Sequence, residues 1–422
     1  MIETLIGLGW DPNLATFVAL LLGAVVVSSF GLVWIIFAIW LERKVAGRIQ
    51  DRLGPNRAGP YGLFQTFADV GKLLTKEDIT PAGADRHIYN IAPILAVASI
   101  VLIWAVVPFN HVWIGADLNV GVLYFVAVGS LATLAIMLAG WGSNNKYALL
   151  GAFRVIAALV SYEIPMVLAL AVPVMLAGTM STMGIVEGQS IAFIFVVPVS
   201  ALIFFISSVA EVGRSPFDLI EAESEIIAGF NIEYSGMKFA MFFAGEFLHA
   251  FTICVLTAIM FLGGWRGLNA GQDGYELLGF AMLMGKSMLV YFVVMLMRST
   301  FPRMRIDHMM NFNWKFLVPL ALVNLVVVAV LARFFVPDYA AAQAAVEAGG
   351  LAGFAGSIFG SGFVAEFPRA VVLLVANTIM AVVALNLLHR YAEQERRKTY
   401  SMVRAQSSAG VPAETIPATA GR

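Results

Sequence analysis

Residues that bind metals or redox cofactors are scarce in this sequence. Its 422 residues include one cysteine, Cys254, and five histidines. An iron–sulfur cluster or a cysteine-based zinc site needs several thiolates, so this chain alone holds neither. The histidines are scattered, and none pairs with another at metal-ligand spacing. No glycine-rich loop of the phosphate- or dinucleotide-binding type follows a plausible strand. We therefore expect no metal and no redox cofactor on this chain. If electrons move near it, another subunit carries them.

Charged residues are also few. They make up 13% of the chain, against 60% hydrophobic residues, whereas a soluble domain has roughly 25% charged residues. A helix needs ~20 apolar residues to cross the ~30 Å hydrocarbon layer. The sequence therefore predicts an all-α, polytopic membrane helix bundle. Nine segments are long and apolar enough to span: 14–40, 89–108, 120–140, 156–177, 191–210, 240–262, 278–297, 316–336 and 369–388.

Two features of other membrane chains are missing. No basic residue precedes the first apolar segment and no small-residue cleavage site follows it, so we expect a retained span rather than a signal peptide. The chain shows no internal repeat and no paired broken helices of the kind that mark inverted-repeat transporters.

The positions of Lys and Arg test the division of the sequence into nine spans, because basic residues are retained on the cytoplasmic side of a membrane. All but four of the 26 fall in alternate connections when the N-terminus is placed outside. The exceptions are Arg266, Arg333 and Arg369 at the outer side and Lys286 inside a span. We predict an outer N-terminus, a cytoplasmic C-terminus and these inner segments: 41–88, 141–155, 211–239, 298–315 and 389 onward.

The inner segment "EVGRSPFDLIEAESEIIAGFNIEYSG" (211–236) is dense in acids. In a continuous helix, five of its charged residues recur at steps of three and four and share one face about 20 Å long. Pro216 requires a kink or a restart within that helix. A solvated acidic surface is the alternative, but apolar groups alternate with the acids, which favours a partly buried lining. The five residues are Glu211, Arg214, Asp218, Glu221 and Glu225.

Further charges lie within or beside the predicted spans. Glu163 opens the fourth span, Glu246 lies inside the sixth with His249 one turn on, and Lys286 lies inside the seventh. A charge at the centre of a membrane helix costs ~2.5–3.5 kcal/mol, so such groups usually face a polar cavity and serve ion or proton pathways. A structural ion pair between Glu246 and Lys286 is the alternative.

The first inner segment, "ERKVAGRIQDRLGPNRAGPYGLFQTFADVGKLLTKED", combines bases with an amphipathic pattern. The two Gly-Pro turns of "LGPNRAGP" predict a rigid corner. A helix after this corner places Leu63, Phe64, Phe67, Val70 and Leu74 on one face, so we expect it to lie in the membrane interface. Cytoplasmic anchoring explains the bases of the first half, but it does not explain the corner.

Four stretches together resemble one family, the quinone-channel membrane subunit of proton-pumping NADH:quinone oxidoreductase, respiratory complex I. They are the two inner segments quoted above, "SNNKYALLGAFRVIAALVSYEIP" and "FPRMRIDHMMNFNWKFLVPLALVN". The resemblance runs from about residue 15 to residue 336. It implies a core of eight transmembrane helices over 1–336. The resemblance does not cover 337–422, where hydropathy and composition predict an outer connection (337–368), an extra ninth helix (369–388) and a largely disordered cytoplasmic tail (389–422).

The resemblance also implies roles for particular residues. A proton relay of carboxylates would run between the quinone cavity and the antiporter-like subunits, with Arg214 and Lys286 in support. The relay residues would be Glu163, Glu211, Asp218, Glu221, Glu223, Glu225 and Glu246. The quinone cavity would be lined by Arg43, Arg52, Asp69, Phe243 and Arg298.

The same resemblance implies a division of labour among subunits. Quinone, either ubiquinone or menaquinone, would be the substrate, and flavin and iron–sulfur clusters would belong to partner subunits. Expected partners are the peripheral-arm subunits with the terminal cluster and the quinone headgroup site, and the small and antiporter-like membrane subunits. We expect contact with lipid, no contact with nucleic acid, and a bacterial plasma-membrane location. A related hydrogenase or other-donor dehydrogenase is the nearest alternative, and a stand-alone ion-coupled transporter is a more distant one.

Overall fold

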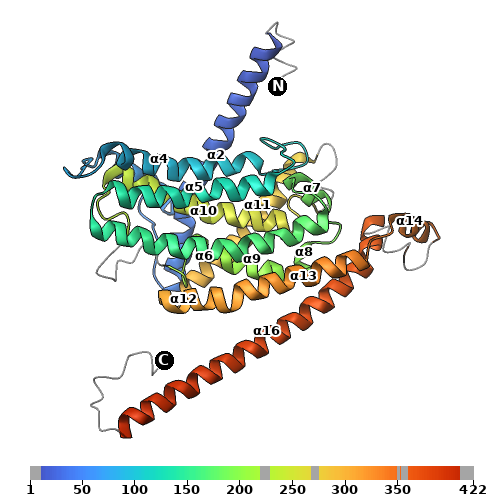
Figure 1. Ribbon diagram of the computed structural model, residues 1–422. Coiled ribbons are helices and arrows are strands. Elements are labelled where there is room, and N and C mark those ends of the chain that lie inside the picture. The colour runs from blue at the N-terminus through green and yellow to red at the C-terminus, as the bar shows by residue number, and fades with distance from the viewer. Residues whose placement is uncertain (1–10, 219–228, 268–274, 349–351, 353–359, 409–422) are drawn as a thin grey trace.

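The computed structural model describes residues 11–218, 229–267, 275–348, 352 and 360–408, and these form a helix bundle (Figure 1). Within these ranges eight helical segments are long and apolar enough to cross a membrane, and no strand occurs apart from an isolated bridge between Pro108 and Ile114. The all-α prediction is therefore confirmed. The eight are α2 (Pro12–Ile49), α4 (Arg86–Ile103, extended by η2 to Val106), α5 (Gly121–Gly142), α6 (Lys146–Ala177), α10 (Gly236–Phe261), α11 (Glu276–Thr300), α12 to α13 (Ile306–Phe334) and α16 (Ser361–Ser408).

The predicted fifth span, 191–210, is wrong as a continuous helix. It is divided into a single turn, α8 (Phe193–Val196), and α9 (Pro198–Glu211), after the short α7 (Thr182–Glu187). Val197 between them has φ −131° and ψ 64°, outside the helical region. Pro198 causes the break, because it lacks an N–H donor and disfavours the helical conformation in the residue before it. At ~1.5 Å per residue, α9 is about 21 Å long and too short to cross the hydrocarbon layer alone.

The connections between helices gather at two ends of the bundle, as the Lys and Arg pattern requires. At one end Lys238 pairs with Asp78, and the backbone N–H of Met304 donates to the carbonyl of Pro216. At the other end Ser181 donates to Asp117, and Asn110 donates to the carbonyl of Glu276. These contacts are consistent with three of the predicted inner segments, 41–88, 211–239 and 298–315, sharing one end. Which end faces the cytoplasm stays a prediction.

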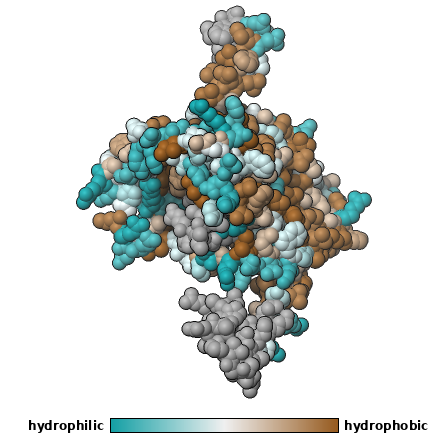
Figure 2. Space-filling model, turned by 60° about the vertical axis from the view of Figure 1, so that its left-hand side comes forward, coloured by the Kyte–Doolittle hydropathy of each residue, from teal (hydrophilic) through white to brown (hydrophobic). Residues whose placement is uncertain are grey.

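Helix α10 lies at the centre of the bundle. Every residue from Phe247 to Phe261 is buried, because α10 contacts α2, α4, α9 and α11. Large apolar side chains elsewhere are exposed in the isolated chain, among them Leu134, Leu202 and Val326. Figure 2 shows hydrophobic side chains spread over the flank of the bundle, with hydrophilic ones concentrated beside them. This is the distribution expected for a flank that faces lipid or neighbouring membrane subunits.

The predicted corner and amphipathic helix are both present. After the 3-10 turn η1 (Pro60–Gly62), α3 (Gln65–Thr75) carries an exposed apolar face. Gly62 has φ +77°, and a Cβ there would lie 2.2 Å from the carbonyl oxygen of Pro55. Only glycine fits this close approach, so the turn fixes the angle between α2 and α3.

The C-terminal region is more helical than predicted. The connection 337–368 contains α14 (Tyr339–Glu347), and α16 begins at Ser361 and continues past the predicted end at residue 388 to Ser408. Glu, Gln, Arg and Ala are good helix formers, and the extension lacks glycine and proline. The prediction of a largely disordered tail is therefore wrong for 389–408, and 409–422 lies outside the described residues. In Figure 1, α16 runs along the edge of the bundle and extends beyond it.

Candidate functional site

A buried carboxylate, Glu42, joins α2 to α11 and to the segment that follows α9. It lies near the end of α2, and its side chain is 10% exposed. Arg214 donates Nη1 to its Oε1 at 3.1 Å, Tyr291 of α11 donates its hydroxyl to Oε2 at 3.2 Å, and Arg298 of α11 also pairs with Oε1. The sequence pattern did not single out Glu42, because it stands beside Arg43 and Lys44 and is easily counted with the anchoring bases. An acid at the inner end of an apolar span is the signal that it offered.

Arg214 links Glu42 to a second acid. Its Nε lies 3.5 Å from Oε1 of Glu246, and its guanidinium carbon lies 4.3 Å from the ring centre of Phe247. Only 4% of the Arg214 side chain is exposed. A buried guanidinium needs such compensation, because an unpaired charge in a low-dielectric region is costly. Arg214 is therefore shared between Glu42 and Glu246.

The predicted helical ladder is wrong between residues 212 and 218. Helix α9 ends at Glu211, and Gly213 follows with φ +69°. This left-handed conformation stops the helix, and Pro216 cannot continue it. Arg214 consequently turns back into the bundle instead of lining a helix face with Asp218. The acids Glu221, Glu223 and Glu225 lie outside the described residues.

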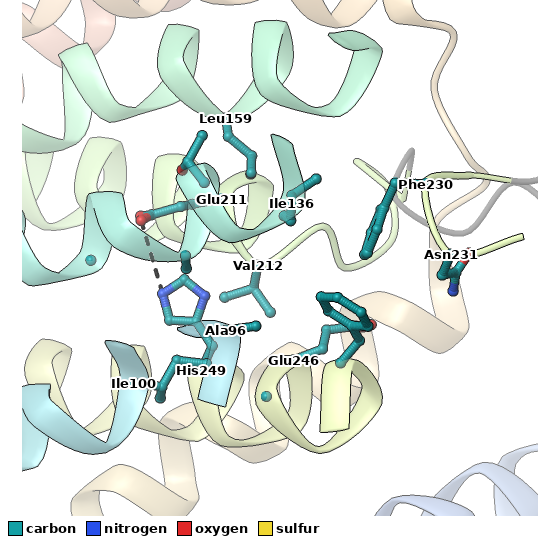
Figure 3. A pocket seen from close by; sticks show the side chains of 15 residues that line it. Ala96, Ile100, Ile136, Leu159, Glu211, Val212, Phe230, Asn231, Glu246 and His249 are labelled. Carbon is teal, nitrogen blue, oxygen red and sulfur yellow. Dashed lines mark ion pairs between the residues drawn. The ribbon is translucent and has the colours of Figure 1, made fainter. Parts of the chain in front are cut away.

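A cavity of about 70 Å³ lies between Glu246 and Glu211. Both acids line it, together with His249, Asn231 and mostly apolar residues of α4, α5, α6 and α10. Figure 3 shows Glu211 and the imidazole of His249 approaching each other from different helices, and Nε2 of His249 lies 3.9 Å from Oε1 of Glu211. A water needs a cavity of at least ~10–15 Å³ and polar partners, so this one has room for a few waters.

Glu163 extends the row of acids beyond the cavity. It lies on α6, half-buried, within electrostatic range of Glu211. The order of charged groups is Glu42, Arg214, Glu246, the cavity with His249, Glu211 and Glu163. Two of the predicted relay acids within the bundle thus lie on opposite sides of one cavity, and a third is next to them.

The predicted quinone residues fall into two groups. Arg43 pairs with Asp69 at 2.5 Å and joins α2 to α3, while Arg298 pairs with Glu42, the residue before Arg43. Phe243 stacks against neighbouring phenylalanines on the side of α10 that leads toward Arg214. Arg52 is exposed and donates its Nε–H to Gln50 at 2.6 Å, so the described contacts do not join it to Arg43 or Arg298.

The match to known proteins covers this whole site. A family model described as NADH dehydrogenase matches residues 22–329. The chain belongs to the NADH dehydrogenase family. Among its relatives is the NADH-quinone oxidoreductase subunit designated H from Dehalococcoides mccartyi strain CBDB1, 46% identical over 310 residues, or 74% of this chain and 86% of the relative. The same subunit from Geobacillus kaustophilus is 46% identical over 334 residues, 78% of this chain and 97% of the relative. Its counterpart from Bacteroides thetaiotaomicron is 43% identical over 326 residues, or 74% of this chain and 90% of the relative.

These findings confirm the resemblance to a membrane subunit of NADH:quinone oxidoreductase that the four sequence stretches carry. The match to the NADH dehydrogenase family ends at residue 329. Helices α14 and α16 therefore lie beyond the part of the chain that defines the family, whereas Glu42, Arg214, Glu246 and Glu211 all lie within it.

Lys286 lies far from the acids and does not pair with Glu246. Its Nζ donates to three backbone carbonyls, those of Leu262 at 2.8 Å, Gly264 at 2.9 Å and Arg266 at 2.7 Å. These carbonyls follow the end of α10, where a helix leaves acceptors without partners. The ion pair considered from the sequence is therefore replaced by a cap on the C-terminal end of α10.

Removing this cap should destabilise the chain. Lys286→Met leaves three carbonyls without their donor, which we expect to cost on the order of 2–3 kcal/mol and to lower the Tm of the detergent-solubilised complex. Lys146→Met is the matched control, because Lys146 is exposed at the start of α6. Equal Tm values for the two variants would contradict the capping role.

Proposed function

We propose that this member of the NADH dehydrogenase family forms part of a quinone-binding tunnel and couples quinone reduction to proton translocation through its carboxylates. The observation that carries the proposal is the row of charged groups from Arg43 and Glu42, through Arg214 and Glu246, to Glu211. A bundle that needed only anchorage would not place this many charges among apolar helices, because each one is costly there.

The entrance of the proposed tunnel is the inner end of α2, α3 and α11. Arg43 and Arg298 have side chains 44% and 43% exposed, so their guanidiniums are accessible from outside the chain. The exposed apolar face of α3 lies next to them, since α3 contacts both α2 and α10. Two cations beside an apolar surface suit a molecule with a reducible headgroup and a lipid-soluble tail, and a quinone has this chemistry.

Coupling in this proposal is electrostatic. A new negative charge beside Arg298 weakens the hold of Arg298 on Glu42, and Arg214 then bonds Glu42 more strongly and Glu246 less. Unit charges 4 Å apart interact by about 4 kcal/mol at an effective dielectric constant of 20. A single exchange of partners by Arg214 therefore supplies enough energy to change the proton affinity of Glu246 and of the acids beyond the cavity.

The remaining subunits complete the reaction. Electrons from NADH reach the quinone through flavin and iron–sulfur clusters of peripheral partners. Protons leave this chain toward small and antiporter-like membrane subunits. In a bacterial plasma membrane, the end of the bundle that holds Glu42 would face the cytoplasm.

Glu211→Gln and Glu163→Gln test the acid route. In complex reconstituted into liposomes, we expect each variant to lower proton-coupled quinone reduction by at least ~10-fold, because a positioned acid or base typically contributes ~10²–10⁴-fold to a proton-transfer step. NADH oxidation by ferricyanide should be retained, because it needs only the peripheral subunits. Glu347→Gln, exposed on α14, is the control. Unchanged proton-to-electron ratios and rates in both variants would remove these acids from the route.

A further inference from the structure

We infer that His249 is a proton-relay residue that carries protons between Glu246 and Glu211 across the cavity. The inference rests on the proposed function and adds to it a residue that is not an acid. Glu246 and His249 lie three residues apart on α10 and therefore on the same face of the helix. Both line the cavity, and Glu211 enters it from α9 (Figure 3).

The distance between His249 and Glu211 suits a water-assisted proton transfer. Nε2 of His249 lies 3.9 Å from Oε1 of Glu211, which is too long for a direct hydrogen bond. A small rotation of either side chain, or one water in the cavity, closes this gap. The second carboxyl oxygen of Glu211, Oε2, is buried and has no hydrogen-bond partner among the described residues. Glu211 is thus left with an open position for a proton donor.

The surroundings leave His249 as the group that links the acids. The side chains that α4 and α5 present to the cavity do not titrate. They include Ala96 and Ile100 of α4 and Thr133 and Ile136 of α5. Among the described residues, the titratable groups at the cavity are Glu246 on the same helix, Glu211 on α9 and, behind Glu211, Glu163 on α6. An imidazole accepts a proton at one nitrogen and donates at the other. With a glutamate on each side, the protonated carboxylic acid is the donor and the ionised carboxylate is the acceptor.

Packing does not account for an imidazole here. From Phe247 to Phe261 the buried residues of α10 are otherwise apolar or carry small hydroxyl or thiol groups. A polar ring in that position costs free energy unless it is bonded. The cavity and the nearby carboxylate of Glu211, reached through a small rotation or a water, supply the polar partners that offset this cost, so the ring is placed where protons would pass.

A pair of variants with nearly the same shape separates the relay from a structural role. His249→Gln keeps a hydrogen-bonding side chain but cannot carry a proton, whereas His249→Glu can. We expect His249→Gln to lower proton-coupled quinone reduction by ~10-fold or more, and His249→Glu to retain several times the rate of His249→Gln. A purely structural residue gives the opposite order, because a further carboxylate beside Glu211 adds like-charge repulsion.

Rates are measured on purified complex that a native gel shows to contain this chain, and they are expressed per ferricyanide-reducing activity, so that loss of assembled protein does not count as loss of relay. His389→Gln, exposed on α16, is the control. A His249→Gln rate within about twofold of the wild type, or a His249→Glu rate no higher than that of His249→Gln, would overturn the inference. Glu211→Gln measured alongside separates the two claims: if it alone is impaired, the acid route stands without His249, and if it too is unimpaired, the route itself fails.

Discussion

Glu42→Leu is expected to prevent stable accumulation of the complex. The substitution leaves Arg214 and Arg298 without the carboxylate that they share, and Tyr291 without its acceptor. Breaking a buried ion pair by removing one partner costs about 3–5 kcal/mol, a large part of the ~5–15 kcal/mol that stabilises a typical domain. Native gels with flavin quantification should show a severe loss of assembled complex.

The same change at an exposed acid should have little effect. Glu77→Leu is the control, because Glu77 is exposed after α3 and a surface substitution usually changes stability by no more than ~0.5 kcal/mol. Glu42→Gln keeps a hydrogen-bond acceptor and should assemble to an intermediate level, with slower quinone reduction per complex. Normal assembly of Glu42→Leu would show that the two guanidiniums find other partners, and Glu42 would no longer link the ends of α2 and α11.

The sequence predicted the helices well where hydropathy alone determines them. The long apolar segments, the amphipathic α3 and the Gly-Pro corner follow from spacing and composition, and the structure confirms them. The broken fifth span was missed, although Pro198 was visible, because a hydropathy window averages over a local break. The extension of α16 beyond residue 388 was missed for the reverse reason, since a polar helix carries no hydropathy signal.

The candidate site was less predictable, because it depends on how separate helices meet. Glu211 and Glu246 could be singled out by the cost of charge in a membrane helix, and the structure brings them to one cavity. The partner of Arg214 could not be predicted in the same way. Arg214 pairs with Glu42, 172 positions away in the sequence, and a helical pattern placed it wrongly with its neighbours. The alternative pairing of Lys286 with Glu246 is wrong, because a sequence pattern does not reveal that the ammonium group reaches backbone carbonyls of another segment. The described contacts give Lys286 no link to the relay acids that it was expected to support.

Gly151→Ala is expected to impair coupled turnover more than any other single-methyl change near the cavity. Gly151 of α6 lies against Gly229, and a Cβ at Gly151 would be 2.7 Å from the carbonyl carbon and 2.8 Å from the carbonyl oxygen of that residue. Both are backbone atoms, so the added methyl must displace the chain and not merely a flexible side chain. Overpacking of this kind typically costs ~1–3 kcal/mol.

The displaced residues are part of the cavity wall. Phe230 and Asn231 directly follow Gly229 and line the cavity opposite Glu211, and Phe230 packs edge-on against Phe242 at 5.1 Å. Just beyond them Tyr234 stacks on Tyr89 and donates its hydroxyl to the carbonyl of that residue. Burial raises the pKa of Tyr234 above its ordinary value, so this donor keeps its proton in alkaline as well as neutral solution. Because that end is fixed, the strain from Gly151→Ala falls on Phe230 and Asn231. We expect proton-coupled quinone reduction to fall several-fold while ferricyanide reduction is retained.

Gly129→Ala supplies the matched comparison, because Gly129 lines the same cavity from α5 and a Cβ there would meet no atom within 4 Å. Alanine at that position should be tolerated and should favour the helix by ~0.5–1 kcal/mol. Gly129→Ala adds its methyl group to the cavity itself, whereas Gly151→Ala adds the same group against the backbone that precedes the cavity residues Phe230 and Asn231. A difference in coupled rate therefore measures the placement of Gly229 to Asn231 and not the cavity volume. If both variants lose coupled rate equally, the added methyl volume matters and not its position. If both keep the wild-type coupled rate, proton transfer does not depend on the placement of Gly229 to Asn231. An effect confined to Gly151→Ala would assign the end of the acidic segment a direct part in shaping the path between Glu246 and Glu211.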